Sequence, residues 1–176
     1  MYDRIHDAGA EVVAVSVDDD IRQSGMARRW GFTHTRFVSD PGGETYLQPL
    51  GLFDPEDRGG IALPGILIFS PAGEEVYRYE SRDFADRTRD EELMGALTAL
   101  GLDAVDPEPW LGDADGPDDL RGYFRPKDLV PYFKGNFFGA IAIGRRLADD
   151  ESRAVAKEHR IMSQANIDAW DEWRKR

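Results

Sequence analysis

The sequence predicts an α/β fold, and three observations on its first hundred residues support that prediction. Residues 12–17 form a short apolar run rich in β-branched side chains, which is typical of a strand covered on both faces. A second apolar run, at residues 66–69, is followed by a turn and a half-exposed strand. Segments with helix-capping residues or an apolar stripe at helical spacing lie around these runs. Helices that alternate with strands in this way indicate α/β architecture.

The first elements have recognisable helix boundaries. Residues 1–8 indicate the end of a helix, and a glycine follows them as its stop. Asp18, Asp19 and Asp20 offer N-caps for a helix over residues 21–30. The same three carboxylates could hold a cation, but helix capping explains them more simply.

The next segments are shorter. Residues 35–39 indicate a strand that ends in a turn, and residues 43–50 could form one or two helical turns. Residues 51–63 are rich in Gly, Pro and Asp, so we expect a loop there.

The region ends in a hairpin and a helix. Ser70 to Gly73 suits a type I turn, with Pro in the second position and Gly in the fourth, and residues 74–79 indicate the partner strand. Thr88 and Glu91 have the spacing of a capping box. The helix that follows has one apolar face, which is made by Leu93, Met94, Leu97 and Leu100.

Composition divides the chain into three parts. Residues 1–102 form the α/β domain, residues 103–119 an acidic, proline-containing linker, and residues 120–176 a helical C-terminal extension. Two helices are expected in the extension, because two apolar stripes recur there at roughly helical spacing. The stripes are Phe133, Phe137, Ile141 and Leu147, and Val155, Met162, Ala169 and Trp173.

Bulk composition excludes several classes of function. The chain has 176 residues, a net charge of −12 and no cysteine. Without cysteine there can be no disulfide, thiolate metal site or cysteine nucleophile. The acidic balance disfavours nucleic acid as a partner. No apolar run is long enough to span a membrane and the first residues do not open a signal peptide, so we expect a cytoplasmic protein.

Other candidate sites are weak in this sequence. His6, His34 and His159 have no partner at metal-ligand spacing. The acidic stretch around Asp113 and Asp115 does not have the register of a calcium-binding loop. We therefore expect no metal and no cofactor.

Three quoted stretches carry a family resemblance. "GAEVVAVSVDD", "WGFTHTRFVSDPGGETYLQPLGL" and "ALPGILIFSPAGEEVYRY" follow one another in an order that resembles the redoxin (AhpC/TSA, peroxiredoxin-like) branch of the thioredoxin-like superfamily. The resemblance covers roughly residues 1–101. It implies a thioredoxin-like three-layer α/β sandwich, here N-terminally truncated and followed by the helical extension. The family's activity is thiol-dependent reduction of peroxides or disulfides.

The resemblance also implies a binding position. Pro64 would be the cis-proline that opens the hairpin strand, and Leu63 before it would offer its backbone to an extended peptide or a thiol partner across a cleft. A plainer interpretation is that a proline simply begins a strand. Peroxiredoxins carry an arginine where Pro64 stands, so the pattern is closer to the cis-proline kind of redoxin.

The family's first strand and its reactive cysteine have no counterpart here. That strand would lie between residues 12–17 and residues 66–69, so each of these strands would present an unpaired edge. Three arrangements would repair this: direct pairing, filling by another chain or by the C-terminal region, or a true start upstream of Met1. We expect the last, through a wrongly chosen start or a truncated gene.

These observations predict a redoxin-like protein that has no catalytic residue and is inactive as given. The alternative is a non-catalytic thioredoxin-fold binding module that uses either the Pro64 cleft or the basic part of the extension. A carboxylate-based enzyme of unrelated chemistry is a third interpretation, without a defined pair of residues.

The basic part of the extension has two interpretations. Residues 120–148 carry a net charge of +5, whereas residues 1–119 carry −16. The segment could bind an anion or a membrane surface, or it could pack on the core and meet the acidic domain. Both helices could equally form a homodimer interface anchored by Trp170 and Trp173. The candidate anion contacts are Arg121, Arg125, Lys127, Lys134, Arg145 and Arg146.

Overall fold

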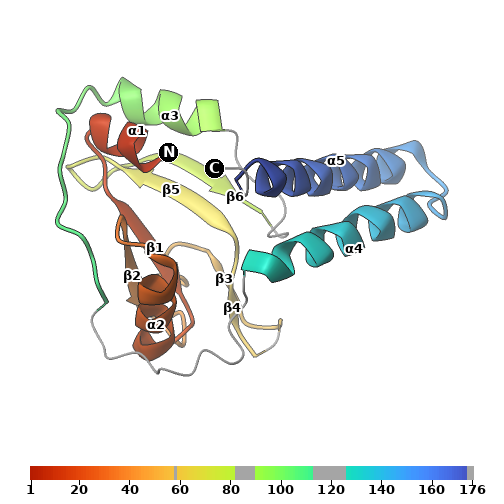
Figure 1. Ribbon diagram of the computed structural model, residues 1–176, viewed down its shortest axis with the longest axis horizontal. Coiled ribbons are helices and arrows are strands. Elements are labelled where there is room, and N and C mark those ends of the chain that lie inside the picture. Colours follow the sequence, from red (N-terminus) through yellow and green to blue (C-terminus); the bar gives the residue numbers. More distant parts are fainter. Residues whose placement is uncertain (58, 82–89, 113–125, 174–176) are drawn as a thin grey trace. The chain divides into compact units, whose positions relative to one another are not determined.

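The computed structural model describes the chain except residues 58, 82–89, 113–125 and 174–176. It is a mixed α/β structure, as predicted (Figure 1). The chain divides into two compact units: Met1–Asp83 with Thr88–Arg121, hereafter the α/β unit, and Phe84–Arg87 with Gly122–Arg176, hereafter the helical hairpin. In chain order the elements are α1 (Tyr2–Asp7), β1 (Val12–Ser16), α2 (Asp20–Trp30), β2 (Thr35–Ser39), β3 (Phe53–Asp54), β4 (Ile61–Ala62), β5 (Gly65–Phe69), β6 (Glu75–Glu80), α3 (Asp90–Ala99), α4 (Pro126–Gly144) and α5 (Asp150–Trp173).

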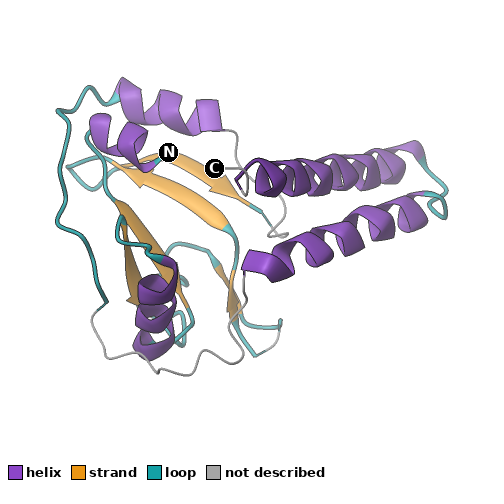
Figure 2. Ribbon diagram, viewed as in Figure 1, coloured by secondary structure: helices purple, strands orange, loops and turns teal. Residues whose placement is uncertain are grey.

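The described strands form three separate two-stranded sheets, drawn in orange in Figure 2. β1 and β2 are parallel, with Val12 opposite Thr35. β3 pairs with β4, and β5 pairs with β6, both antiparallel. No described strand joins β1 to β5, so direct pairing of these two strands is not found in this part of the chain.

The core of the α/β unit lies beneath α1 and α3. Ile5 of α1, Ile68 of β5 and two residues of α3, Met94 and Leu97, form its buried centre. Val12 of β1 packs against the same cluster, so β1 and β5 share a core although they are not paired. The predicted apolar face of the α3 helix is confirmed by the burial of Met94 and Leu97.

Local signals determine both ends of α2, as predicted. Asp19 caps α2, since its Oδ1 accepts the N–H of Arg22 at 2.7 Å. Gly31 ends α2 in the left-handed conformation, with φ of +69°. Capping therefore accounts for Asp19 without a cation.

The middle of the unit differs in part from the expectations. Residues 43–50 form hydrogen-bonded turns: the Leu50 N–H bonds to Tyr46 O, four residues back as in a helix, but the Gln48 N–H bonds to Gly43 O, five residues back, so no regular helix forms. The expected loop at residues 51–63 contains the short ladder of β3 and β4. Its two-residue strands are too short to show an alternating pattern in the sequence.

Residues 103–112, expected as part of a linker, run along the α/β unit. The Val105 N–H donates to His6 O at 3.0 Å, and the Trp110 N–H donates to Thr33 O at 2.9 Å. The ring of Trp110 contacts that of Phe37, with 5.4 Å between centroids. The expected domain boundaries themselves remain a prediction, since residues 113–119 lie outside the described residues.

The helical hairpin consists of α4 and α5, which run side by side (Figure 1). Phe133 near the start of α4 packs with Ile167 near the end of α5, and Gly144 at the end of α4 lies against Ala156 near the start of α5. These two contacts show that the helices are antiparallel. Two helices were predicted here, and both are present.

The predicted stripe on α5 is not the buried one. Val155 is 62% exposed, whereas Ser163 is fully buried and Ile167 is buried. A small residue such as Ser163 lets the two backbones approach closely, so apolarity alone does not identify the packed face. The side chain of Trp173 lies outside the described residues, and the homodimer interface remains a prediction. Among the described helices, none has the length and apolarity needed to cross a bilayer.

Candidate functional site

The strongest candidate site consists of two strand edges, one on β1 and one on β5, that pair with no other strand in the described part of the chain. β1 and β5 contain no charged residue. Their partners are charged: β2 carries Arg36, and β6 carries Glu75, Arg78 and Glu80. Natural edge strands are protected from further pairing by charges and prolines. In these two sheets the charged strands, β2 and β6, are protected in this way, whereas their partners β1 and β5 are not.

The hydrogen bonding of β5 shows which backbone groups face its open edge. The Ser81 N–H donates to Pro64 O at 2.8 Å, which sets the phase of the antiparallel ladder. Bonded pairs then recur at every second residue, so Ile66 bonds to its partner Tyr79. The N–H and C=O groups of Gly65 and Leu67 are therefore directed away from β6.

The same reasoning applies to β1. The Asp40 N–H donates to Ser16 O at 2.8 Å, so Ser16 directs its backbone groups toward β2. Along a parallel strand such groups alternate between the two edges. The N–H and C=O groups of Val13 and Val15 are therefore directed away from β2, toward the open edge.

Side chains on these strands are unusually accessible for apolar residues. Val13 is 55% exposed and Phe69 is 45% exposed. Val15 and Leu67 are half-buried, and Gly65 is exposed. Each edge therefore combines free backbone groups with apolar surface, which is the combination that another strand can cover.

The Pro64 segment does not have the expected form. The bond between Leu63 and Pro64 is trans, so the expectation of a cis-proline is wrong. The trans form is favoured by about 0.5–1 kcal/mol for an X–Pro bond. Here the Leu63 N–H donates to Leu52 O at 2.9 Å, and Pro64 O accepts from Ser81. The N–H of Leu63 and the C=O of Pro64 are thus already used within the unit.

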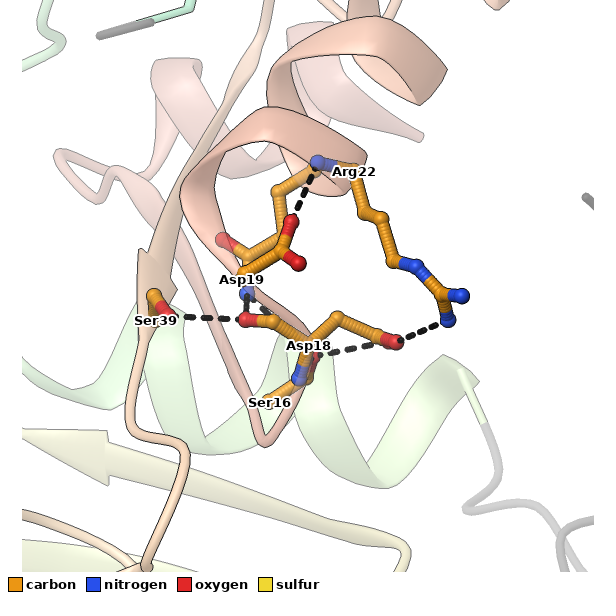
Figure 3. A network of polar contacts seen from close by, with 6 residues as sticks. Ser16, Asp18, Asp19, Arg22 and Ser39 are labelled. Atoms are coloured by element: carbon orange, nitrogen blue, oxygen red, sulfur yellow. Dashed lines mark hydrogen bonds and ion pairs between the residues drawn. The ribbon is translucent and has the colours of Figure 1, made fainter. Parts of the chain in front are cut away.

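A polar network closes the carboxyl ends of β1 and β2 (Figure 3). Ser16 Oγ donates to Asp18 Oδ2 at 3.1 Å, and Ser39 Oγ donates to the backbone oxygen of Asp18 at 2.8 Å. Arg22 lies 3.7 Å from the Asp18 carboxylate, in an exposed pair. These contacts hold the turn after β1 against the end of β2.

Gln23 strengthens this closure from α2. Its side chain is almost fully buried, at 3% exposure. Its Nε2 donates to Ser16 Oγ, Asp18 O and Val38 O at 3.0–3.2 Å. Gln23 therefore ties α2 to both strands and stabilises the β1–β2 pair.

Two histidines meet in the structure although 28 residues separate them in the sequence. The rings of His6 and His34 lie 5.5 Å apart, and Tyr2 stacks on His34 at 5.4 Å. Tyr2 Oη and Thr35 Oγ1 are hydrogen-bonded at 2.7 Å. Nothing in the spacing of these residues predicted the cluster. Among the described residues, no group of three or more His, Cys, Asp or Glu side chains could hold a metal.

The expected anion contacts are only partly brought together. Lys134 lies in α4, and Arg145 follows its last residue. Arg146 lies one residue further on, in the turn after α4, where its N–H donates to Ile143 O at 2.8 Å. Arg121 and Arg125 lie outside the described residues, as does the side chain of Lys127. Sequence reasoning missed Lys157 and Arg160 of α5, although their spacing in an amphipathic helix was a signal for them.

Comparison with known proteins adds no relative. No family model matches the chain, no curated protein is similar to it, and no solved structure matches it.

Proposed function

We propose that the α/β unit is a non-catalytic binding module that accepts an extended peptide strand of a partner protein along the open edges of β1 and β5. The observation that carries this proposal is the distribution of charge between paired strands. The strands with open edges are uncharged, and the strands on their other side are charged.

Backbone chemistry makes the proposal specific. Val13, Val15, Gly65 and Leu67 direct donors and acceptors away from their partner strands, and an added strand would satisfy them. An unsatisfied buried backbone group costs about 1–3 kcal/mol, so covering these edges with anything but a strand would be unfavourable. The exposed side chains of Val13 and Phe69 would supply apolar contacts.

The resemblance to redoxins is consistent with this proposal if the chain descends from a thioredoxin-like protein. In that family an extended partner is held by backbone groups beside the hairpin strand. The chain has no cysteine, so it cannot form the thiolate on which the family's chemistry depends. We propose that it binds an extended partner through backbone groups as that family does, but at Gly65 and Leu67 instead of Leu63, and without the thiol reaction.

Peptide binding and amide exchange test the proposal together. A short labelled peptide of alternating valine and threonine is titrated with the full chain and followed by fluorescence anisotropy. We expect saturable binding, together with slower hydrogen exchange at the amides of Val13, Val15, Gly65 and Leu67. A peptide with N-methylated backbone nitrogens should not bind, because it cannot complete the ladder.

Two lysine substitutions form a matched pair. Phe69 and Val76 have nearly equal exposure, 45% and 44%, but Phe69 lies on open-edged β5 and Val76 on β6. F69K should weaken peptide binding at least tenfold, whereas V76K should leave it nearly unchanged. Equal loss in both variants, or protection of β6 amides instead of β5 amides, would overturn the proposal. Circular dichroism of both variants checks that they fold.

A separate assay tests the absence of thiol chemistry. With a dithiol reductant and hydrogen peroxide, the chain should consume no more peroxide than buffer does. Turnover above buffer would show that another group performs the reaction.

A further inference from the structure

The antiparallel geometry of the helical hairpin determines which side chains share a face. On α4 the helix interface contains Phe133, Ala140 and Gly144, and on α5 it contains Ala156, Ser163 and Ile167. A residue that follows a buried position is rotated by about 100° around its helix axis. In an antiparallel pair that rotation carries both helices' residues toward the same side. The residues after these interface positions are Lys134, Ile141 and Arg145 on α4, and Lys157, Gln164 and Asp168 on α5.

This side of the hairpin carries four cations besides Arg153, and of these four Arg145 and Lys157 lie nearest the turn. Lys134, Phe138, Ile141 and Arg145 are spaced by four, three and four residues, so they line one stripe. The helical bond from the Arg145 N–H to Ile141 O, at 3.2 Å, extends that stripe past the end of α4. Arg160 lies one turn after Lys157 on α5 and joins the same side. We call Lys134, Phe138, Ile141, Arg145, Lys157, Arg160 and Ile161 the basic face.

The four cations of the basic face are not neutralised within the described hairpin. None of Lys134, Arg145, Lys157 and Arg160 has a carboxylate within 4.0 Å among the described residues. Arg153 on the same side differs, because it pairs with Asp150 at 2.7 Å. Asp168 and Asp171 lie on this side beyond Gln164, far from the turn, at the level of Lys134, because Phe133 packs with Ile167.

Large apolar side chains protrude between these cations. Phe138 is 64% exposed and Ile161 is 54% exposed. The Phe138 ring contacts the ring of Phe137 in an edge-to-face arrangement, with 5.3 Å between centroids. Exposed aromatic surface surrounded by cations is the composition of a surface that rests on anionic lipid, with the ring among the headgroups.

We infer that the basic face docks the hairpin onto an anionic phospholipid surface, with Phe138 entering the interface and the four cations meeting the headgroups. The opposite side of the hairpin provides the contrast. It carries Ile143, Val155 and Met162 together with Glu151 and Glu158, so it would be repelled by the same lipid. Charge complementarity thus selects one side of the hairpin.

Vesicle sedimentation tests the inference with the full chain. Vesicles of phosphatidylcholine alone are compared with vesicles that contain about one-third phosphatidylserine. We expect the chain to sediment with the phosphatidylserine vesicles and to be released by high salt, because the attraction is screened within about 10 Å at 0.1 M. Equal binding to both vesicles, or binding to neither, would overturn the inference.

Two matched pairs locate the contact. R145E should weaken binding at least fivefold, since each basic residue near an anionic surface contributes about that factor, whereas R146E should have little effect. F138S should weaken binding, whereas I143S, which removes a residue of similar exposure (58%), should not. Equal effects within either pair would refute the assignment of this face. Circular dichroism confirms that the four variants remain helical.

Inorganic phosphate distinguishes a membrane from a free anion. If the basic face were a site for a small anion, millimolar phosphate would displace the vesicles and F138S would bind as well as the wild-type chain. That result would refute docking on lipid. If the wild-type chain still binds the vesicles in millimolar phosphate and F138S does not, docking on lipid is supported.

Discussion

The carboxylate of Asp40 reaches seven residues along the chain and accepts the N–H of Leu47 at 2.9 Å. The same carboxylate accepts the N–H groups of Tyr46 and Thr45, at 2.9 and 3.1 Å. Asp40 is 3% exposed and follows β2 directly. One side chain therefore organises the turns between β2 and β3, where one or two helical turns were expected.

The stability of this loop should depend on pH through Asp40. Burial raises the pKa of Asp40, but the N–H groups of Leu47, Tyr46 and Thr45 outweigh burial and hold the pKa below its ordinary value of 3.8. A carboxyl group with a lowered pKa stabilises the fold above its unfolded-state pKa, and this contribution is lost as the pH falls through the folded-state pKa.

D40N should therefore be less stable than the wild-type chain at pH 7, and the difference should shrink as the pH falls below about 3.8. Urea unfolding of both proteins at pH 7 and again below the pKa of Asp40 measures this difference in stability. D103N, which changes an exposed aspartate in the same unit, should show neither effect. A difference for D40N that is constant with pH would contradict this assignment.

The ring of Phe53 occupies the space where a side chain on Gly43 would begin. A Cβ on Gly43 would lie 2.8 Å from Phe53 Cγ, and Gly43 has φ of +68°. G51A provides the control, since Gly51 has φ of +72° and open space around it. G51A should cost about 1–2 kcal/mol from backbone strain alone. G43A should cost about 1–3 kcal/mol more from overpacking, measured by denaturant unfolding. Equal costs would mean that Phe53 moves aside freely.

Substitutions of His6 and Tyr2, which lie in one cluster, should change the free energy of unfolding in opposite directions. His6 Nε2 is buried and has no hydrogen-bond partner among the described residues. H6F removes this unsatisfied atom and should raise the free energy of unfolding by about 1 kcal/mol. Y2F removes the partner of buried Thr35 and should lower it by about 1 kcal/mol. The two variants are compared by urea unfolding, and destabilisation by H6F would indicate that Nε2 has a role that its surroundings do not reveal.

Ser163 tests the close packing of α4 on α5. It is fully buried, and its Oγ donates to His159 O at 2.9 Å. S163A keeps the small volume and should change stability by less than about 1 kcal/mol. S163L should destabilise the hairpin by about 1–3 kcal/mol, because a large side chain would separate the helices. Thermal melts followed by circular dichroism compare the two, and equal melting temperatures would show that the interface is loosely packed.

Helix ends and helix faces were predictable because their signals are local. The N-cap at Asp19 and the buried pair Met94 and Leu97 depend on residues within about one or two turns. The loop between β2 and β5 was less predictable. There the geometry depends on Asp40 bonding several residues ahead and on Phe53 packing against a distant glycine.

The candidate site shows the same division. The sequence identified β5 and the basic residues Lys134 and Arg145, but it placed the binding position at Leu63 and Pro64. In the structure the free backbone groups belong instead to Gly65 and Leu67, because the phase of the ladder with β6 decides which groups remain free. An added signal was present in the sequence: β1 and β5 contain no charge.

By itself, the sequence determined the α/β class, the N-cap of α2, the apolar face of α3, and the exclusion of thiol chemistry by the absence of cysteine. Only the tertiary structure decided that β1 and β5 lie in separate sheets, that His6 meets His34, and that Ser163 faces α4. The reason is physical. Capping and periodicity act between neighbours along the chain, whereas strand pairing and helix packing depend on which distant segments the fold brings together.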